Sequence, residues 1–441
     1  MTKKMLFIGS IIFVLILAGV AYASYYFSGR QGEIRPQDAG YYANNQDTQP
    51  ADSTLPPQDP YQDYTYEDNF DNEQNQDGYN NYGQDNGQSD YGGYIAEAPG
   101  YEPIPWYYCD SDTASPWHPI HFRDVRAPRL LGPSTPHGYI AVQHIHHLND
   151  YFYSRFPFSY QEKGAAVWIV EELLAMGHPW HNIHVQEFGI YDVNRTAQDI
   201  ARWHMFNTVY HNYSYLRDTY HSQNVVLTIP GQSSQTIVVG AHYDTVLYPG
   251  ASDNASGTAL LLESAQRMLD VDNYYTIVYI FFGAEEVGLL GARYYVDNLP
   301  QQDLDNIIFM INADVLFEGP YFIFGGGYHN PANPWRQPSQ NAISQQWEEI
   351  ATTMNAQHNL DIRPYHPGIF LSSDQLVFME AGLTVMMLFG TDFHPNGNMY
   401  FRVLHSHRDC FHYITNRWPY KIDDAMRTFS IFLEEVLLAR Y

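Results

Sequence analysis

Cysteine and basic residues are scarce in this chain of 441 residues. The two cysteines, Cys109 and Cys410, are too few for a disulfide scaffold or a cysteine-rich zinc module. Lysine and arginine number 22 against 49 acidic residues, for a formal net charge of −27. Neutralising phosphate needs clustered lysine and arginine, so this charge argues against a nucleic-acid partner and against anionic lipid surfaces. The length allows one large domain with a tail, or two ordinary domains.

Charged side chains are absent from residues 5–27, which follow Lys3 and Lys4. Such a stretch is long enough to cross a hydrocarbon core about 30 Å thick as a helix. Ala21-Tyr22-Ala23 also resembles the cleavage site of a signal peptide, although the apolar run is longer than signal peptides usually have. Residues 1–30 are therefore predicted to be a membrane anchor, or alternatively a cleaved signal peptide. Both interpretations place the rest of the chain outside the cytoplasm.

Valine, methionine and tryptophan are absent from residues 31–104, where glutamine, asparagine, aspartate, glycine and tyrosine dominate. This stretch carries 15 acidic side chains against one arginine. It cannot bury enough apolar surface to offset the entropy of ordering it, so we interpret it as a disordered acidic stalk. The remaining residues, 105–441, are predicted to form the folded domain.

Periodic apolar segments begin after about Trp106. Runs typical of strands occur at Asn224–Ile229, Thr236–Ala241, Thr276–Phe282, Ile307–Ile311 and Thr384–Phe389. Helical patterns alternate with them, at Gly257–Leu269, Gly288–Leu299, Gln345–Leu360, Asp374–Ala381 and Asp423–Arg440. Strands that are apolar on both faces and separated by helices predict an α/β fold, with a mixed, mostly parallel central sheet and helices on both faces. In such sheets the functional site lies at the carboxyl ends of the strands.

Two features precede these segments. Ser159 and Glu162 have the spacing of a capping box that starts a helix, and Gly177 has the position that ends it. Further upstream, His144, His146 and His147 look like a metal cluster. We expect packing or surface roles for them, because they lie on a predicted helix far from the strand ends.

His242 and Asp244 follow the predicted strand Thr236–Ala241. Residues two apart on a strand share a face, so the imidazole and the carboxylate can touch. A histidine that binds a metal through one nitrogen needs its other N–H held, and a carboxylate does this well. The pair alone is weak support, since most such pairs are incidental.

Asp253 lies in Gly250-Ala251-Ser252-Asp253-Asn254-Ala255-Ser256-Gly257, a loop of small residues that leads into a helix. Small residues allow close approach of the backbone and leave this carboxylate unobstructed. The alternative is an ordinary N-cap for the following helix, although a cap does not explain so many small neighbours.

Further acidic residues and a second histidine follow later strands. Glu285 and Glu286 follow Thr276–Phe282, Asp314 follows Ile307–Ile311, and His405 lies in a late loop. Adjacent carboxylates after an apolar strand are costly unless a cation or a shared proton stabilises them, and the alternative is a solvated acidic turn. Together these groups form a mixed nitrogen and oxygen set that suits zinc, or less specifically cobalt or manganese. Five ligands with one shared carboxylate fit two ions about 3.5–4 Å apart.

The chain resembles the M28 family of zinc metallopeptidases, in particular its aminopeptidase branch. The resemblance covers about residues 140–440. It rests on the segments GAHYDTV (240–246), PGASDNASG (249–257), FFGAEEVGLLGARYY (281–295), INADV (311–315), LSSDQLVFMEAGLTV (371–385) and LHSHRD (404–409). It implies a zinc-exopeptidase fold of the phosphorylase/hydrolase-like type over residues 105–441, and hydrolysis of N-terminal residues from peptides.

The resemblance also implies a role for each site residue and two Zn²⁺ ions as cofactors. His242 and Asp314 would bind one zinc, Glu286 and His405 would bind the other, and Asp253 would bridge both. Asp244 would orient His242. Glu285 would be the general base that takes a proton from the metal-bridging water and passes it to the leaving amine.

The last motif departs from the family pattern, which usually has a small hydroxyl residue, a proline and a threonine around its histidine. His405 aligns cleanly, but His407 is a nearby competitor for the same metal position. In an oxidising compartment, Cys410 of the same segment could pair with Cys109, which gives a second hypothesis for this part of the chain.

Three alternative functions stay open from the sequence. Some relatives are glutaminyl cyclases that use one zinc, although FFGAEEVGLLGARYY is closer to the peptidase version. Other relatives are carboxypeptidases or dipeptidases, which the metal motifs do not separate from aminopeptidases. A binding ectodomain that has lost catalysis is the third, and the presence of every ligand and of the base argues against it.

Overall fold

The computed structural model describes residues 135–190, 192–193, 221–246, 248–328, 339–365, 372–419 and 421–441. All of them belong to one compact unit within residues 87–441. The predicted anchor or signal peptide, the predicted stalk and Cys109 lie outside the described residues. Within the described ranges, no helix is both long and apolar enough to cross a membrane.

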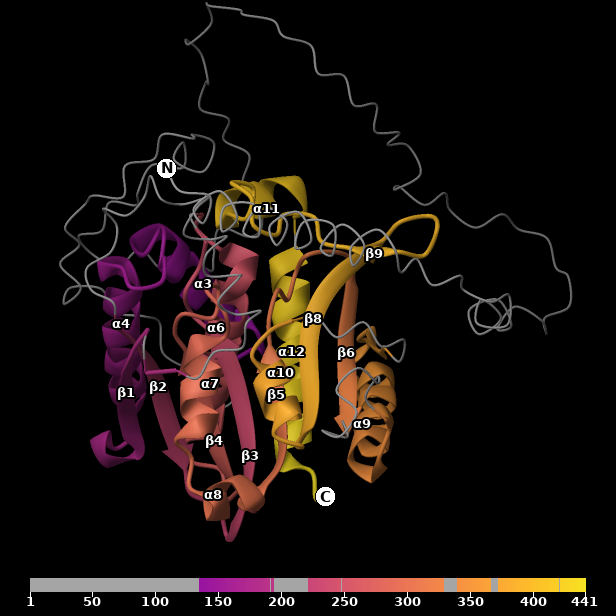
Figure 1. Cartoon of the computed structure of the whole chain (residues 1–441). Helices are drawn as coiled ribbons and strands as arrows, with labels where there is room; N and C mark the ends of the chain where they lie inside the picture. The colour runs from indigo at the N-terminus through magenta and orange to yellow at the C-terminus, as the bar shows by residue number, and fades with distance from the viewer. Residues whose placement is uncertain are drawn as a thin grey trace, which may run out of the picture. The chain divides into compact units, whose positions relative to one another are not determined.

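A mixed sheet runs through the centre of this unit (Figure 1). Its strand order is β1-β2-β4-β3-β5-β8-β6-β7, and β9 pairs with β8 beside this path. The four middle strands are parallel: β4 (Tyr275–Phe282), β3 (Ser233–His242), β5 (Ile307–Ala313) and β8 (Thr384–Phe393). The outer strands are β1 (Ile183–Gly189), β2 (His221–Ile229), β6 (Tyr321–Tyr328), β7 (Ile362–Pro364) and β9 (Met399–Tyr400). Antiparallel pairing joins β2 to β4 and β6 to β8.

Helices cover both faces of the sheet, because its middle strands are apolar on both faces. In β4, Ile277, Tyr279 and Phe281 face one core, while Val278, Ile280 and Phe282 face another. The larger core lies under α3 (Tyr139–Tyr151), α4 (Tyr160–Met176), α6 (Ser256–Arg267), α9 (Ala342–His358) and α12 (Lys421–Leu438). The smaller core lies under α7 (Leu290–Asp297), α8 (Gln301–Asn306) and α10 (Gln375–Glu380). The fold is the predicted α/β class.

Each predicted strand and helix from residue 224 onward coincides with an observed element, but four strands were missed. β1 shows little periodicity because it is an edge strand whose residues are mostly exposed or half-buried. β6 contains Gly325-Gly326-Gly327, a run that normally argues against a strand. A Cβ at Gly326 would lie 2.0 Å from the Val385 carbonyl oxygen, so close packing against β8 explains the glycine.

The helix α4 starts where the capping box was predicted, but only half of the box forms. The Ser159 hydroxyl accepts the Glu162 N–H at 3.1 Å. The Glu162 carboxylate does not return the bond to Ser159, whose N–H donates to the Phe156 carbonyl instead. It accepts the N–H groups of Phe158 and Ala284 and the Ser222 hydroxyl. The prediction of a reciprocal box was therefore wrong, because Glu162 makes longer-range contacts that stabilise the fold.

His144 and His147 of α3 have the packing role that the sequence predicted. His144 is fully buried and meets Trp168 edge-on, and His147 stacks on the same indole with ring centroids 4.7 Å apart. Burial lowers the pKa of His144 to about 3, so its imidazole is neutral in the folded protein.

Candidate metal centre

The predicted site residues lie at the carboxyl ends of neighbouring parallel strands. His242 is the last residue of β3, Asp314 directly follows β5, and Glu286 follows β4 by four residues. Asp253 lies on a short π-helical turn, Ala251–Ala255, that leads into α6. His405 lies in the loop between β9 and α11 (Phe411–Arg417). The topology explains this meeting, because β4, β3 and β5 are adjacent and run in the same direction.

These five residues form two groups of three that share Asp253. In the first group, His242 Nε2 is 3.2 Å from Asp253 Oδ1 and 3.3 Å from Asp314 Oδ1. In the second, His405 Nε2 is 3.0 Å from Asp253 Oδ2 and 3.3 Å from Glu286 Oε2. The donor atoms of each group lie within 4.8 Å of one another. The two oxygens of one carboxylate thus face one imidazole each.

The surroundings of these groups fit cations. Glu286 Oε1 is buried and has no hydrogen-bond partner among the described residues. Burial, and next the charge of Asp253, raises the pKa of Glu286 to about 7. Glu286, more than any other neighbour, raises the pKa of His405 to about 12, against the effect of burial. A divalent cation beside Glu286 would stabilise the ionised form of this buried carboxylate.

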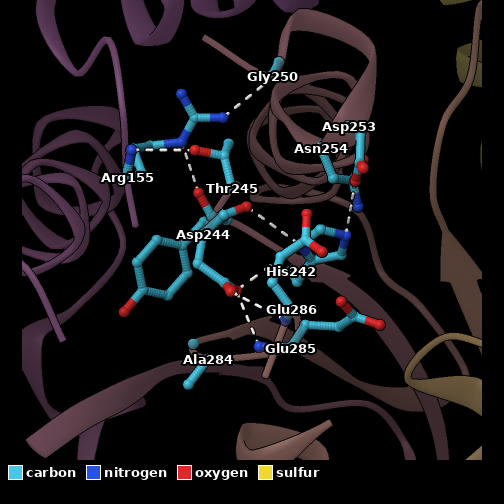
Figure 2. A network of polar contacts seen from close by, with 12 residues as sticks. Arg155, His242, Asp244, Thr245, Gly250, Asp253, Asn254, Ala284, Glu285 and Glu286 are labelled. Atoms are coloured by element: carbon cyan, nitrogen blue, oxygen red, sulfur yellow. Dashed lines mark hydrogen bonds and ion pairs between the residues drawn. The ribbon is translucent and has the colours of Figure 1, made fainter. Parts of the chain in front are cut away.

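Asp244 holds the loop that carries Glu285 and Glu286. Its carboxylate oxygens accept the Glu285 N–H at 3.0 Å and the Glu286 N–H at 3.1 Å (Figure 2). Its Oδ1 also lies 3.6 Å from His242 Nδ1, while the Asp244 carbonyl oxygen is nearer to that nitrogen, at 3.1 Å. The Asp244 carboxylate therefore lies beside His242, although the backbone carbonyl is the nearer partner of that nitrogen, and the predicted orienting role stays a prediction. Asp244 also positions both glutamates, which the sequence did not indicate.

Glu285 belongs to neither group of three. Its side chain is mostly buried, and this burial is the largest cause that raises the pKa of Glu285 well above the ordinary value.

Three non-glycine residues beside the predicted site residues, or among them, have positive φ values. These are 54° at Ala284, 51° at Val315 and 54° at His405. Non-glycine residues in this region cost on the order of 1–3 kcal/mol each, so the fold keeps strained backbone at the site.

Three further buried carboxylates hold the loops of the site, and the sequence analysis missed their roles. Glu162 accepts the Ala284 N–H at 3.0 Å. Asp409 accepts the N–H groups of Ser252 and Asp253. Glu318 accepts those of Val403 and Leu404, next to His405. Asp409 could have been suspected from its place in LHSHRD, whereas Glu162 was assigned to a capping box and Glu318 carried no signal.

Arg155 is a buried cation beside the site that was also missed. Its guanidinium donates to the carbonyl oxygens of Tyr243 and Pro249 and to that of Gly250 (Figure 2), residues that lie close to His242 and Asp253 in the chain. Burial lowers its pKa to about 10, so it stays protonated at neutral pH. Its segment, FYSRFPFS, shows one arginine among aromatic residues, and that contrast could have indicated a buried charge.

Three further residues lie near the site: His407, Asp374 and Cys410. His407, the competitor for the position of His405, joins neither group and meets Tyr248 edge-on. Asp374 is fully buried, and neither of its carboxylate oxygens has a hydrogen-bond partner among the described residues. Burial raises its pKa well above the ordinary value. Cys410 is buried just before α11 and is disulfide-bonded, and Cys109, the other cysteine of the sequence, lies outside the described residues.

Glu162→Gln is expected to lower kcat on the order of 10-fold, with little change in KM. Three donors point at the Glu162 oxygens, so the NH₂ group of a glutamine would face an N–H or O–H group. The Ala284–Glu286 loop would then shift. A displacement of about 1 Å can lower the rate of an enzyme by up to 10²-fold, even far from the reacting atoms. The free energy of unfolding should fall by about 2–3 kcal/mol.

Glu263→Gln is the matched control for that change. The Glu263 carboxylate is also buried and accepts the N–H groups of Gly138 and Ala141, the Ser430 hydroxyl and, at 2.8 Å, the Arg267 guanidinium, away from the site. This variant should lose at least as much stability, because it also weakens an ion pair, and keep the wild-type kcat. Equal loss of kcat in both variants, measured with chemical denaturation curves alongside, would contradict a positioning role for Glu162.

The α/β sheet and the paired groups at its carboxyl edge define a metal-dependent hydrolase fold. Residues 224–430, just under half of the chain, match the model of Peptidase family M28. The aminopeptidase YwaD of Bacillus subtilis is 44% identical over 81 residues, 18% of this chain and 18% of its own length. The chain thus spans about a fifth of that curated relative.

Solved structures support the fold assignment. BSAP, a zinc aminopeptidase from Bacillus subtilis, aligns with 69% of this chain and 96% of its own, with a TM-score of 0.52 and 17% identity. A glutaminyl cyclase from Bacteroides thetaiotaomicron aligns with 72% of this chain and 100% of its own, with a TM-score of 0.50 and 16% identity. At such low identity these similarities show the fold alone.

Proposed function

We propose that the protein is an exported aminopeptidase that uses two zinc ions to release N-terminal residues from peptides. The observation that carries the proposal is Asp253, whose two carboxylate oxygens each face one histidine of a separate donor group, with Glu285 outside both groups. One shared carboxylate between two mixed nitrogen and oxygen sets is the arrangement of two-metal hydrolases.

The described residues supply a complete ligand set for two ions. His242 and Asp314 would hold one zinc, Glu286 and His405 would hold the other, and Asp253 would contribute to both. When bound, zinc lowers the pKa of water and polarises a carbonyl group. The protein fixes these ligands through Asp409, Glu318 and Asp244, which hold the backbone of three of the ligand loops.

Glu285 is the residue that would move protons. As general base it takes a proton from the attacking water, and as general acid it returns that proton to the amine of the leaving peptide. Asp244 fixes the backbone of Glu285 at 3.0 Å and so aims this carboxylate. Because Glu285 is not needed as a ligand, its protonation can change while both donor groups stay intact.

An apolar cluster beside the centre indicates which N-terminal residue is accepted. Val315, the neighbour of Asp314, and Leu404, the neighbour of His405, both belong to it. The other members are Ile323, Met387, Phe389, Tyr321, Tyr365, Met399 and Phe401. The cluster therefore adjoins both donor groups through the chain itself, and we propose that its half-buried members Met399, Phe401 and Leu404 contact an apolar residue of the substrate.

The location outside the cytoplasm is part of the proposal and rests on the sequence of residues 1–104. The uncharged stretch 5–27 would tether the enzyme to the membrane, or be removed on secretion, and the acidic segment 31–104 would act as a spacer.

The test is hydrolysis of aminoacyl p-nitroanilides by the zinc-loaded full-length protein. We expect kcat/KM for leucyl, methionyl and phenylalanyl substrates to exceed that for aspartyl and lysyl substrates at least ~10-fold, because charged side chains lose hydration in an apolar pocket. Met399→Glu should lower kcat/KM for the leucyl substrate on the order of 10-fold. Met176→Glu, at a half-buried methionine of α4, is the control and should have no such effect.

The same assay separates the rival functions. No release from any substrate with a free N-terminus, by folded and zinc-loaded protein, would overturn the aminopeptidase proposal. Cyclisation of N-terminal glutamine would then identify a glutaminyl cyclase, and cleavage of N-blocked dipeptides a carboxypeptidase or dipeptidase. If the protein has no activity in any of the three assays, the remaining hypothesis is a binding ectodomain without catalysis.

A further inference from the structure

A second histidine–carboxylate cluster lies between α3 and α11, outside the candidate metal centre. His146 and Asp150 are one turn apart on α3, and His412 is the second residue of α11. His146 Nε2 is 3.2 Å from Asp150 Oδ2, and His412 Nε2 is 3.6 Å from Asp150 Oδ1. One donor atom from each of the three residues lies within 4.8 Å of the other two.

The spacing of this cluster is that of metal ligands. The His412–Asp150 separation is too long for a hydrogen bond, and charge-assisted bonds between such groups are usually about 2.7–2.9 Å long. Donors about 2.0–2.1 Å from a tetrahedral zinc ion are about 3.3–3.4 Å apart from one another. The pairs of the candidate metal centre are 3.0–3.3 Å apart, close to the 3.2 Å and 3.6 Å separations of this cluster.

Other contacts fix the cluster in this arrangement. The Asn149 side chain accepts the Phe411 N–H at 2.9 Å, which ties the start of α11 to α3. The Phe411 ring meets His146 edge-on with centroids 4.9 Å apart, and the rings of His146 and His412 are 5.7 Å apart. The two imidazoles are therefore placed on Asp150 by the packing of the two helices.

Burial and exposure in the cluster suit a site that an ion can enter. The Asp150 side chain is 3% exposed, whereas those of His146 and His412 are 23% and 33% exposed. The two half-exposed imidazoles let solvent reach the cluster, so water could complete the coordination of an ion there.

We propose that His146, Asp150 and His412 bind a third divalent cation, zinc, as a structural clamp between α3 and α11. Two imidazoles and one carboxylate are a set that zinc accepts with one water. The helix α11 directly follows the loop of His405 and Asp409, at the end of the sheet where β8 runs into β9 (Figure 1). Asp409 in turn accepts the N–H groups of Ser252 and Asp253. The clamp would thus stabilise the loop that supports the candidate metal centre.

Zinc content of the full-length protein tests the proposal. Wild type, His412→Ala and His146→Gln are dialysed against buffer with micromolar free zinc, and zinc per chain is measured by inductively coupled plasma mass spectrometry. We expect each variant to hold one zinc fewer than wild type. His137→Gln is the matched control, since His137 is a half-exposed histidine paired with Glu434 at 3.0 Å, and it should keep the wild-type content.

The result is a difference between proteins, so it does not depend on how many ions the candidate metal centre holds. As a second readout, zinc should raise the Tm of wild type more than that of His412→Ala, by on the order of 5 °C at saturating zinc. His146→Gln serves if His412→Ala fails to fold. Equal zinc content in wild type and a folded variant would overturn the proposal, and so would equal zinc-induced shifts in Tm.

Discussion

Glu285→Gln is expected to abolish nearly all peptidase activity while zinc content and folding stay as in wild type. General acid–base catalysis contributes about 10²- to 10⁴-fold, and an amide can neither take a proton from water nor return it to the leaving amine. KM should change little, because Glu285 belongs to neither donor group. The measurement is kcat on leucyl p-nitroanilide, with zinc per chain and the circular dichroism spectrum recorded on the same samples.

The control for this variant is Glu263→Gln, at a buried glutamate away from the site. The same variant is the control for Glu162→Gln. It makes the same chemical change and should leave kcat as it is. If Glu285→Gln keeps more than about a tenth of the wild-type kcat, Glu285 is not the general base, and the search for that group moves to Asp374. That second carboxylate is fully buried and without a hydrogen-bond partner among the described residues.

Asp253→Asn is expected to remove two zinc ions at once and with them the activity. Among the described residues, Asp253 alone contributes an oxygen to both donor groups, and an amide oxygen is a poor zinc ligand compared with a carboxylate. His405→Ala, which alters one group, should lose one ion. After dialysis, zinc per chain should fall by about two in the first variant and about one in the second, and kcat/KM should fall more than ~10³-fold in Asp253→Asn.

Chelation gives the matching result without a substitution. Treatment of wild type with a strong chelator should stop hydrolysis, and added zinc should restore it, whereas Asp253→Asn should not respond to zinc. Retention of both ions by Asp253→Asn would show that this carboxylate is not a shared ligand. Full activity of the zinc-free wild type would remove the metal from the mechanism altogether.

The sequence could predict much of the site because strand ends are readable. His242 and Asp314 each end an apolar run, and the rule that parallel strands present their carboxyl ends to one edge brings them together. Asp253 and Glu286 were identified by small neighbours and by an unusual acidic pair. None of these inferences needed contacts across the fold, because each depended on local pattern and on the direction of a strand.

The parts that could not be predicted depend on distant partners. Glu162 and Ala284 are 122 residues apart, and the spacing of a capping box gave Glu162 a local partner that it does not use. The choice between His405 and His407 likewise depends on where Asp253 and Glu286 lie, since both histidines occupy the same loop. Strand β6 was missed because its glycines disfavour a strand by propensity. They are explained by the close approach of the β8 backbone, which leaves no room for a Cβ at Gly326.

The buried carboxylate of Glu162 also sets the boundary of the smallest working enzyme. Residues 224–430, which match the family, contain every predicted zinc ligand and the general base. The backbone around them is nevertheless held from outside that range, by Glu162 at Ala284 and by Arg155 at Tyr243 and Gly250. A fragment cut to the family match would carry the ligands without the contacts that space them, so recombinant truncations of this protein should start ahead of α3.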